Sequence, residues 1–290
     1  MITVPAPAKI NLTLEVIGRR ADGYHEIDSI VQTIGLCDVL HFEAADDLTF
    51  YSQMPQWSAA ESLSLRAANR IREVTGCSRG ACISIEKNIP LRAGLGGESS
   101  TAAATLIGLN RLWNLKLTHE SLAKIAAELG SDVPFFLYGG TARIRGRGEI
   151  VTPLSVSLLA WVVLLIPAVN VPPDKTAQLY SLVRPEHYSD GTATQRLAAR
   201  LERGAEIGAA ALYNAFDAVA TDYFGLEAWR QQFGPSEAGK VHVAGSGPGL
   251  FLLLPDKQRA EQIYAALRGQ GLNACLAPLL RLDDRDGAVI

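Results

Sequence analysis

The N-terminal part of the chain alternates apolar and polar positions with a period of two. This alternation predicts a strand over 9–17, because successive strand side chains point to opposite faces. The segments 27–35 and 39–43 predict two further strands, and 81–86 predicts another. A charged turn at 18–24 connects the first two of these predicted strands, 9–17 and 27–35. This part of the chain therefore predicts a sheet with several neighbouring strands.

Helical spacing of apolar residues begins after these strands. Ser58 and Glu61 have the spacing of a capping box, and Gly76 is a typical helix terminator, so we expect a helix between them. Thr118 and Gly130 bound a second apolar helix in the same way. A third helix follows the glycine-rich segment that starts at residue 90, and 141–151 predicts a hairpin.

The pattern changes near Pro153. Beyond it, strands and helices are predicted at 160–167, 175–183, 192–202, 205–219, 241–254 (two strands), 256–269 and 273–280. Mixed helices and strands in two halves predict an α+β fold. We expect one domain at 1–155 and a second at 156–290.

Composition narrows the function classes. The 290 residues carry a formal net charge of −3, and no block of like charges occurs, which disfavours a nucleic-acid surface. The four cysteines are scattered, as in a reducing cytosol, and neither they nor the five histidines have metal-ligand spacing. No apolar run is long enough to span a bilayer, and no signal peptide is evident. We therefore expect a cytoplasmic protein with no nucleic-acid or membrane partner.

Residues 90–104 carry the strongest chemical signal. Glycines at 94, 96 and 97 allow positive φ angles, and the hydroxyls of residues 99–101 follow where a helix begins. A helix N-terminus with free N–H groups binds anions, so the segment predicts a phosphate site. It matches neither the Walker A motif nor the dinucleotide fingerprint. The alternative is a glycine-rich turn that only reverses the chain.

Two polar groups could complete such a site. Lys9 and Asn11 lie two residues apart, so they share one face of a strand. Asp132 stands between a helix stop and an apolar run, where a carboxylate in a cleft can accept a proton. The plain alternatives are a solvent-facing pair for Lys9 and Asn11, and an N-cap for Asp132.

A second glycine turn, at 244–249, separates two apolar strands. In this order, residues 7–12, the loop 90–100, 130–136 and this turn resemble the GHMP kinase superfamily. The segment Arg-x-Asp-Gly-Tyr-His at 20–25 narrows the resemblance to the kinases of a CDP-linked methylerythritol. The resemblance implies two α+β domains with a cleft between them. The N-terminal domain would be similar to domain two of ribosomal protein S-five, and the C-terminal one would be ferredoxin-like.

The same resemblance implies roles for individual residues. Lys9 and Asp132 match the catalytic pair of this kinase family, with Asp132 as proton acceptor. Asn11, Tyr24, His25, Thr176 and Tyr180 would bind the substrate, the tyrosines and histidine at its cytosine. ATP would be held by Lys87, Pro90, Leu91, Arg92, Ala93, Gly94, Leu95, Gly96, Gly97, Glu98, Ser99 and Ser100.

The resemblance also implies ATP as phosphoryl donor and Mg²⁺ bridging its phosphates near Ser99 or Ser100, with no dedicated protein carboxylate for the metal. Glu98 stands where a third glycine is common, and its charge would repel a triphosphate unless it points away or faces the metal. Ser62 stands where an asparagine often helps to hold adenine. Thr101 replaces the usual Asn or Asp at the start of the following helix, from which a contact to the base could come.

Two alternatives remain from the sequence. Another small-molecule GHMP kinase, acting on homoserine or mevalonate, would use residues 24 and 25 only as turn residues. A non-enzymatic nucleotide-binding protein on the same fold would tolerate the altered loop at Glu98, but the intact Lys9 and Asp132 disfavour it.

Overall fold

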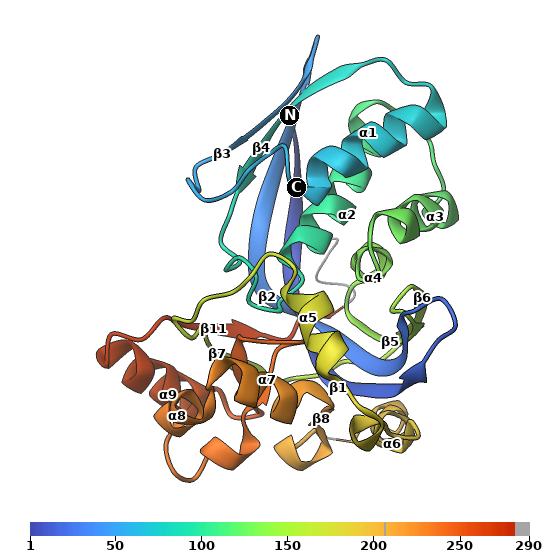
Figure 1. Ribbon diagram of the computed structural model, residues 1–290. Coiled ribbons are helices and arrows are strands. Elements are labelled where there is room, and N and C mark those ends of the chain that lie inside the picture. The colour runs from blue at the N-terminus through green and yellow to red at the C-terminus, as the bar shows by residue number, and fades with distance from the viewer. Residues whose placement is uncertain (206, 282–290) are drawn as a thin grey trace.

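The computed structural model describes residues 1–205 and 207–281, which form two sheets with helices packed against them (Figure 1). The larger sheet has the order β3-β4-β2-β1-β8; in addition, β5 pairs with β2, and β6 pairs with β5. Its strands are β1 (Ile2–Arg19), β2 (His25–Ala45), β3 (Leu48–Ser52), β4 (Gly80–Glu86), β5 (Thr141–Gly146), β6 (Ile150–Leu154) and β8 (Tyr213–Asn214). The prediction of a strand-rich N-terminal sheet is confirmed.

β1 and β2 are the longest strands and pair antiparallel along nearly their whole length. The separate strands predicted at 27–35 and 39–43 are wrong, because β2 runs through both. The register between β1 and β2 shifts between Pro7 and Ala8, and β2 continues through this irregularity as one strand. Residues 27–32 of β2 pair with β5, and residues 39–45 pair with β4.

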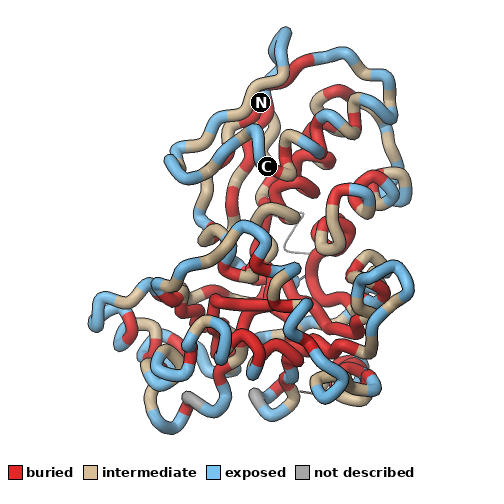
Figure 2. Tube along the Cα trace, in the orientation of Figure 1, coloured by how far each residue is buried: buried red, intermediate tan, exposed pale blue. Residues whose placement is uncertain are grey.

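Helices α1 (Leu63–Thr75), α2 (Gly97–Leu112), α3 (His119–Leu129) and α4 (Val133–Tyr138) lie on one side of this sheet. Their inner faces and the sheet form the core, which Figure 2 shows as buried tube running along the strands. Gly76, Thr118 and Gly130 end or cap helices as predicted. The capping box at Ser58 and Glu61 is wrong: α1 begins at Leu63, and the Ser62 hydroxyl caps it by accepting from Leu65 N.

The smaller sheet has the order β11-β7-β10-β9. Its strands are β7 (Trp161–Leu165), β9 (His242–Val243), β10 (Leu250–Leu254) and β11 (Ala274–Pro278), and the helices of this half are α5 (Lys175–Leu182), α6 (Thr192–Glu202), α7 (Phe216–Phe224), α8 (Glu227–Arg230) and α9 (Lys257–Gly269). The predicted order of elements is confirmed here with one exception. No helix in the described part of the chain has the length and apolar character needed to cross a bilayer.

The exception is the helix predicted over 205–219. The chain instead forms a short 3₁₀ turn and the strand β8, and α7 starts only at Phe216. Tertiary contacts override the helical pattern, because β8 pairs parallel with β1 and the Asn214 amide donates to Val243 O and Gly245 O. Asn214 thereby ties the second glycine turn to the large sheet.

Segments from the second half of the chain pair with and pack against the large sheet of the first half. β8 belongs to the large sheet although it lies late in the sequence, and Leu279 forms a bridge with Ile34 of β2. α6 also packs against β1 and β2. The domain boundary between residues 155 and 156 therefore stays a prediction.

Candidate active site

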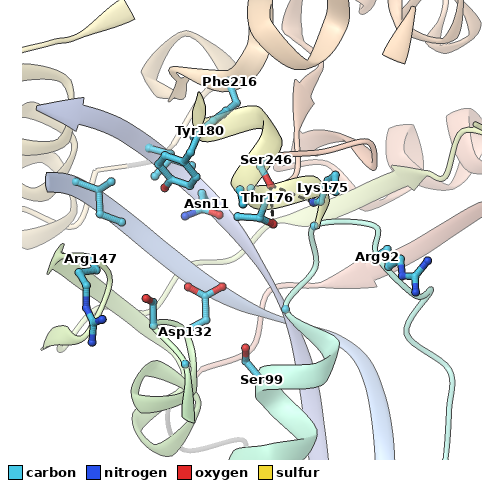
Figure 3. Close-up of a pocket in the computed structure, with 18 of the residues that line it drawn as sticks. Asn11, Arg92, Ser99, Asp132, Arg147, Lys175, Thr176, Tyr180, Phe216 and Ser246 are labelled. Carbon is cyan, nitrogen blue, oxygen red and sulfur yellow. Dashed lines mark hydrogen bonds between the residues drawn. The ribbon is translucent and has the colours of Figure 1, made fainter. Parts of the chain in front are cut away.

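A cavity of about 1360 Å³ lies where the two halves meet. Residues from β1, the β1–β2 turn, the glycine loop, the segment around Asp132 and α5 line it, and Figure 3 shows their side chains around the opening. Every residue assigned to the site from the sequence lines this cavity except Ser100, which is buried one position further into α2. The fold thus brings together groups that are up to 237 positions apart (Lys9 and Ser246).

The glycine loop leads directly into α2. Gly96 is the N-cap with φ 73°, and no side chain of the described residues caps the helix, so its first amides are available to a ligand. Gly94 has φ 87°, and a Cβ there would lie 1.9 Å from Ala244 O of the second glycine turn. The loop conformation and its close approach to the other half therefore both require glycine. Ser99 points toward the cavity from the first turn of α2 (Figure 3).

Lys87 and Glu98 flank this loop. The Lys87 ammonium is buried and lies 2.5 Å from Asp38 Oδ2, so its charge is already compensated. Glu98 Oε1 is 3.9 Å from the same ammonium, and its Oε2 accepts from Leu63 N at 3.4 Å. The Glu98 carboxylate is thus turned toward Lys87 and the start of α1, where the helix dipole favours a negative charge.

Lys9 and Asn11 are buried in β1, so the alternative of a solvent-facing pair is wrong. Lys9 Nζ donates to Asn11 Oδ1 at 2.8 Å and lies 3.4 Å from Asp132 Oδ2. Asn11 in turn donates to Ser29 Oγ at 2.9 Å, which fixes its amide. Asp132 precedes α4 but forms no capping hydrogen bond, so its carboxylate faces Lys9 rather than the helix.

Two positions that depart from the family pattern point away from the cavity. The Ser62 hydroxyl donates to Ala59 O while it caps α1. The Thr101 hydroxyl donates to Glu98 O within its own helix. Both side chains are buried, and their hydroxyls are used inside the protein.

Aromatic residues line the opposite end of the cavity from the glycine loop. The ring of Tyr180 stacks on His25 at 5.3 Å and meets Phe216 edge-on at 4.8 Å. Tyr24 is about half exposed, and the Arg147 guanidinium lies 4.9 Å from its ring centre. Burial, then the positive charge of Arg19, lowers the pKa of His25, so its ring is predominantly neutral at pH 7 and carries both a donor and an acceptor.

Sequence reasoning missed several charged residues that line this cavity, Arg147 and Lys175 among them. Arg147 lies in the turn between β5 and β6, where it was interpreted only as part of a hairpin. Lys175 begins α5 and is buried; its Nζ donates to Ser246 Oγ at 3.0 Å and to Gly247 O at 2.5 Å. The signal for Lys175 was its position directly before Thr176, itself a predicted site residue that approaches Ser246 Oγ at 3.5 Å.

Comparison with known proteins agrees with this geometry. The family model of the GHMP kinases N terminal domain matches residues 62–140, and that of the GHMP kinases C terminal matches 197–273. A 4-diphosphocytidyl-2-C-methyl-D-erythritol kinase of Dehalococcoides mccartyi is 45% identical over 281 residues, covering 97% of this chain and 99% of that protein. The chain belongs to the 4-diphosphocytidyl-2-C-methyl-D-erythritol kinase family. The Bacillus subtilis kinase of the same name is 38% identical over 268 residues, 91% of this chain and 92% of that protein.

Solved structures extend the likeness to the fold of the 4-diphosphocytidyl-2-C-methyl-D-erythritol kinase family. A crystal structure of 4-(cytidine 5'-diphospho)-2C-methyl-D-erythritol kinase superposes with a TM-score of 0.80 at 34% identity, covering 96% of this chain and 99% of the other. A homoserine kinase from Cytophaga hutchinsonii reaches 0.68 at 17% identity, covering 97% and 94%, and shows the shared fold alone. The predicted α+β GHMP kinase fold is confirmed, and the chain is a kinase with an alcohol group as acceptor.

Proposed function

We propose that this protein transfers the γ-phosphoryl group of ATP to the 2-hydroxyl of 4-diphosphocytidyl-2-C-methyl-D-erythritol, a step of the non-mevalonate isoprenoid route. The observation that carries the proposal is one cavity that joins an open helix N-terminus, the Lys9–Asp132 pair and an aromatic end. The helix N-terminus suits a triphosphate, and the Lys9–Asp132 pair suits an attacking hydroxyl. The aromatic end suits a nucleobase. We infer that the reaction takes place in the cytoplasm and involves two small-molecule substrates, with no nucleic-acid or membrane partner.

Asp132 is the proposed proton acceptor. The hydroxyl of the acceptor loses its proton to the Asp132 carboxylate as its oxygen attacks the γ-phosphorus. Lys9, at 3.4 Å from the carboxylate, offsets negative charge on the transferred group. Asn11, fixed by Ser29, binds the methylerythritol portion. Positioning and charge stabilisation supply most of the acceleration in such reactions.

The glycine loop from Pro90 to Ser100, with Lys87 beside it, is the proposed ATP phosphate site. The described residues hold no group of three His, Cys, Asp or Glu side chains that fits a metal, so a magnesium ion would be held by phosphate oxygens, water and a hydroxyl of this loop. Ser99 lines the cavity, and the buried Ser100 Oγ has no hydrogen-bond partner in the described part of the chain, so either hydroxyl is a candidate ligand. When bound, the ion would neutralise charge on the phosphates.

The aromatic end is the proposed cytidine site. Tyr24 and Tyr180 offer ring faces to a base, and the neutral His25 can read its polar edge. Thr176 stands between this end and the second glycine turn and is proposed to contact the sugar-like portion. These assignments rest on the shared lining of one cavity.

A coupled ATPase assay with 4-diphosphocytidyl-2-C-methyl-D-erythritol tests the proposal. We expect turnover far above that of homoserine, mevalonate or a simple diol, with the phosphate on the 2-hydroxyl by NMR. CDP should compete with the acceptor because it occupies the cytidine site. Turnover no better than that of the diol, or no competition by CDP, would overturn the assignment of this acceptor.

A further inference from the structure

Lys175 is a buried lysine at the first position of α5, on the wall of the cavity. Figure 3 shows its ammonium directed to the turn that carries Ser246, with Thr176 beside it. Two of its three N–H donors bond to Ser246 Oγ and Gly247 O. Both acceptors are neutral, so neither compensates the charge.

No carboxylate lies within ion-pair distance of Lys175 in the residues that the structure describes, in contrast to Lys87 with Asp38. Burial, then the nearby positive charge of Lys9, lowers the pKa of Lys175 to about 8, and the negative charge of Asp132 opposes this only in part. A buried cation without a counter-ion is costly, and an anionic ligand removes that cost.

The position of Lys175 indicates which anion this is. Gly247 O, which accepts from Lys175, lies 3.1 Å from the Cβ position of Gly94 in the glycine loop. The Cβ position of Gly245 lies 3.3 Å from Lys9 Nζ. Lys175 therefore binds a turn that touches both the glycine loop and the catalytic lysine, away from the aromatic end.

We propose that Lys175 is a second phosphoryl-binding cation, which together with Lys9 contacts the γ-phosphoryl group at the point of transfer. This rests on the proposed function. As the acceptor oxygen bonds to the γ-phosphorus, the bond from that phosphorus to the β–γ bridging oxygen breaks and ADP leaves. The hydroxyl proton passes to Asp132, and Lys175 keeps its own protons while it offsets charge on the γ-oxygens.

Calorimetric binding of ADP and of the β,γ-imido analogue of ATP, each with Mg²⁺, tests this assignment. Lys175→Met should weaken binding of the analogue about 10- to 100-fold, the usual effect of losing a hydrogen bond to a charged group, and leave ADP affinity within about twofold. Lys175→Arg should restore much of the loss. Lys124→Met is the matched control, because Lys124 is exposed on α3 and pairs with the exposed Glu120 of the same helix.

Two results would overturn the proposal. Equal weakening of ADP and of the analogue would mean that Lys175 only supports the fold of the turn. Unchanged binding of both would mean that Lys175 contacts neither nucleotide. Retained ADP binding also reports that the variant is folded. Neither measurement uses the acceptor, so failure of the acceptor assay and failure of this contrast are distinguishable.

Discussion

The two glycine turns that meet in the cavity, the glycine loop at 90–100 and the turn at 244–249, differ in how their charges are arranged. The first leads into α2, and its neighbouring lysine, Lys87, is neutralised by Asp38. The second separates β9 from β10, and its lysine, Lys175, donates to two neutral acceptors and has no ion pair within the described part of the chain. The first turn thus presents backbone amides to a ligand, whereas the second presents an uncompensated side-chain charge.

This difference suggests that the first turn serves nucleotide binding and the second serves phosphoryl transfer. Backbone amides at a helix N-terminus hold any phosphate chain, whether or not a reaction follows. An uncompensated cation beside Lys9 is most useful where negative charge is rearranged. The comparison predicts that changes at the first turn affect all nucleotides, whereas changes at the second discriminate between ADP and ATP.

The largest effect is expected at Asp132, which lines the same cavity as both turns. Asp132→Asn removes the proton acceptor but keeps its size, so kcat should fall roughly 1000-fold. Thermal stability should fall only slightly, because the Asp132 side chain caps no helix and is about a third exposed in its ion pair with Lys9. The measurement is steady-state turnover beside a thermal melt, with Asp190→Asn, an exposed carboxylate at the start of α6, as control. Turnover within tenfold of wild type would show that Asp132 is not the acceptor of the proton.

Gly94→Ala tests whether the two turns must touch. Its Cβ would meet Ala244 O at 1.9 Å, so the turns must separate, and a displacement of this kind costs about 100-fold in kcat/KM. Gly76→Ala is the matched control: Gly76 also has positive φ, but no atom lies within 4 Å of its Cβ position. We expect the control to lose stability only. Equal kinetic losses in both variants would mean that backbone strain, not the contact, is decisive.

Sequence reasoning found the residues of the first turn but missed the lysine of the second. The glycine loop, Lys9 and Asp132 lie in short motifs whose chemistry is local, and all of these residues except Ser100 line the cavity. Lys175 and Asn214 were missed or misinterpreted because their roles arise from partners more than 25 residues away, Ser246 and Gly245 among them. Helix and strand order was predicted well where periodicity was strong. It failed at 205–219, where pairing of β8 with β1 overrides the helical pattern.

The pH profile sharpens the comparison at the second turn. With a pKa of about 8, set by burial, Lys9 and Asp132, Lys175 is charged at pH 7 and mostly neutral at pH 9. Because only the charged form offsets phosphoryl charge, kcat/KM for ATP should fall about tenfold between these values. In Lys175→Arg the fall should disappear, since arginine stays charged. A fall that persists in this variant would assign the alkaline limb to another group.

The smallest effect is expected at Glu98, which belongs to the first turn yet carries a charge that opposes phosphate. Its carboxylate accepts from Leu63 N and lies near Lys87, so Glu98→Gln should cost only about 0.5 kcal/mol of stability. Removing the partly exposed charge should tighten ATP binding about two- to threefold, because repulsion across solvent is weak. Calorimetry with and without Mg²⁺ measures this, and Glu98→Gly separates charge from side-chain size. If instead ATP binding weakens and only with Mg²⁺ present, Glu98 faces the metal, and the first turn would also provide a side-chain charge for transfer.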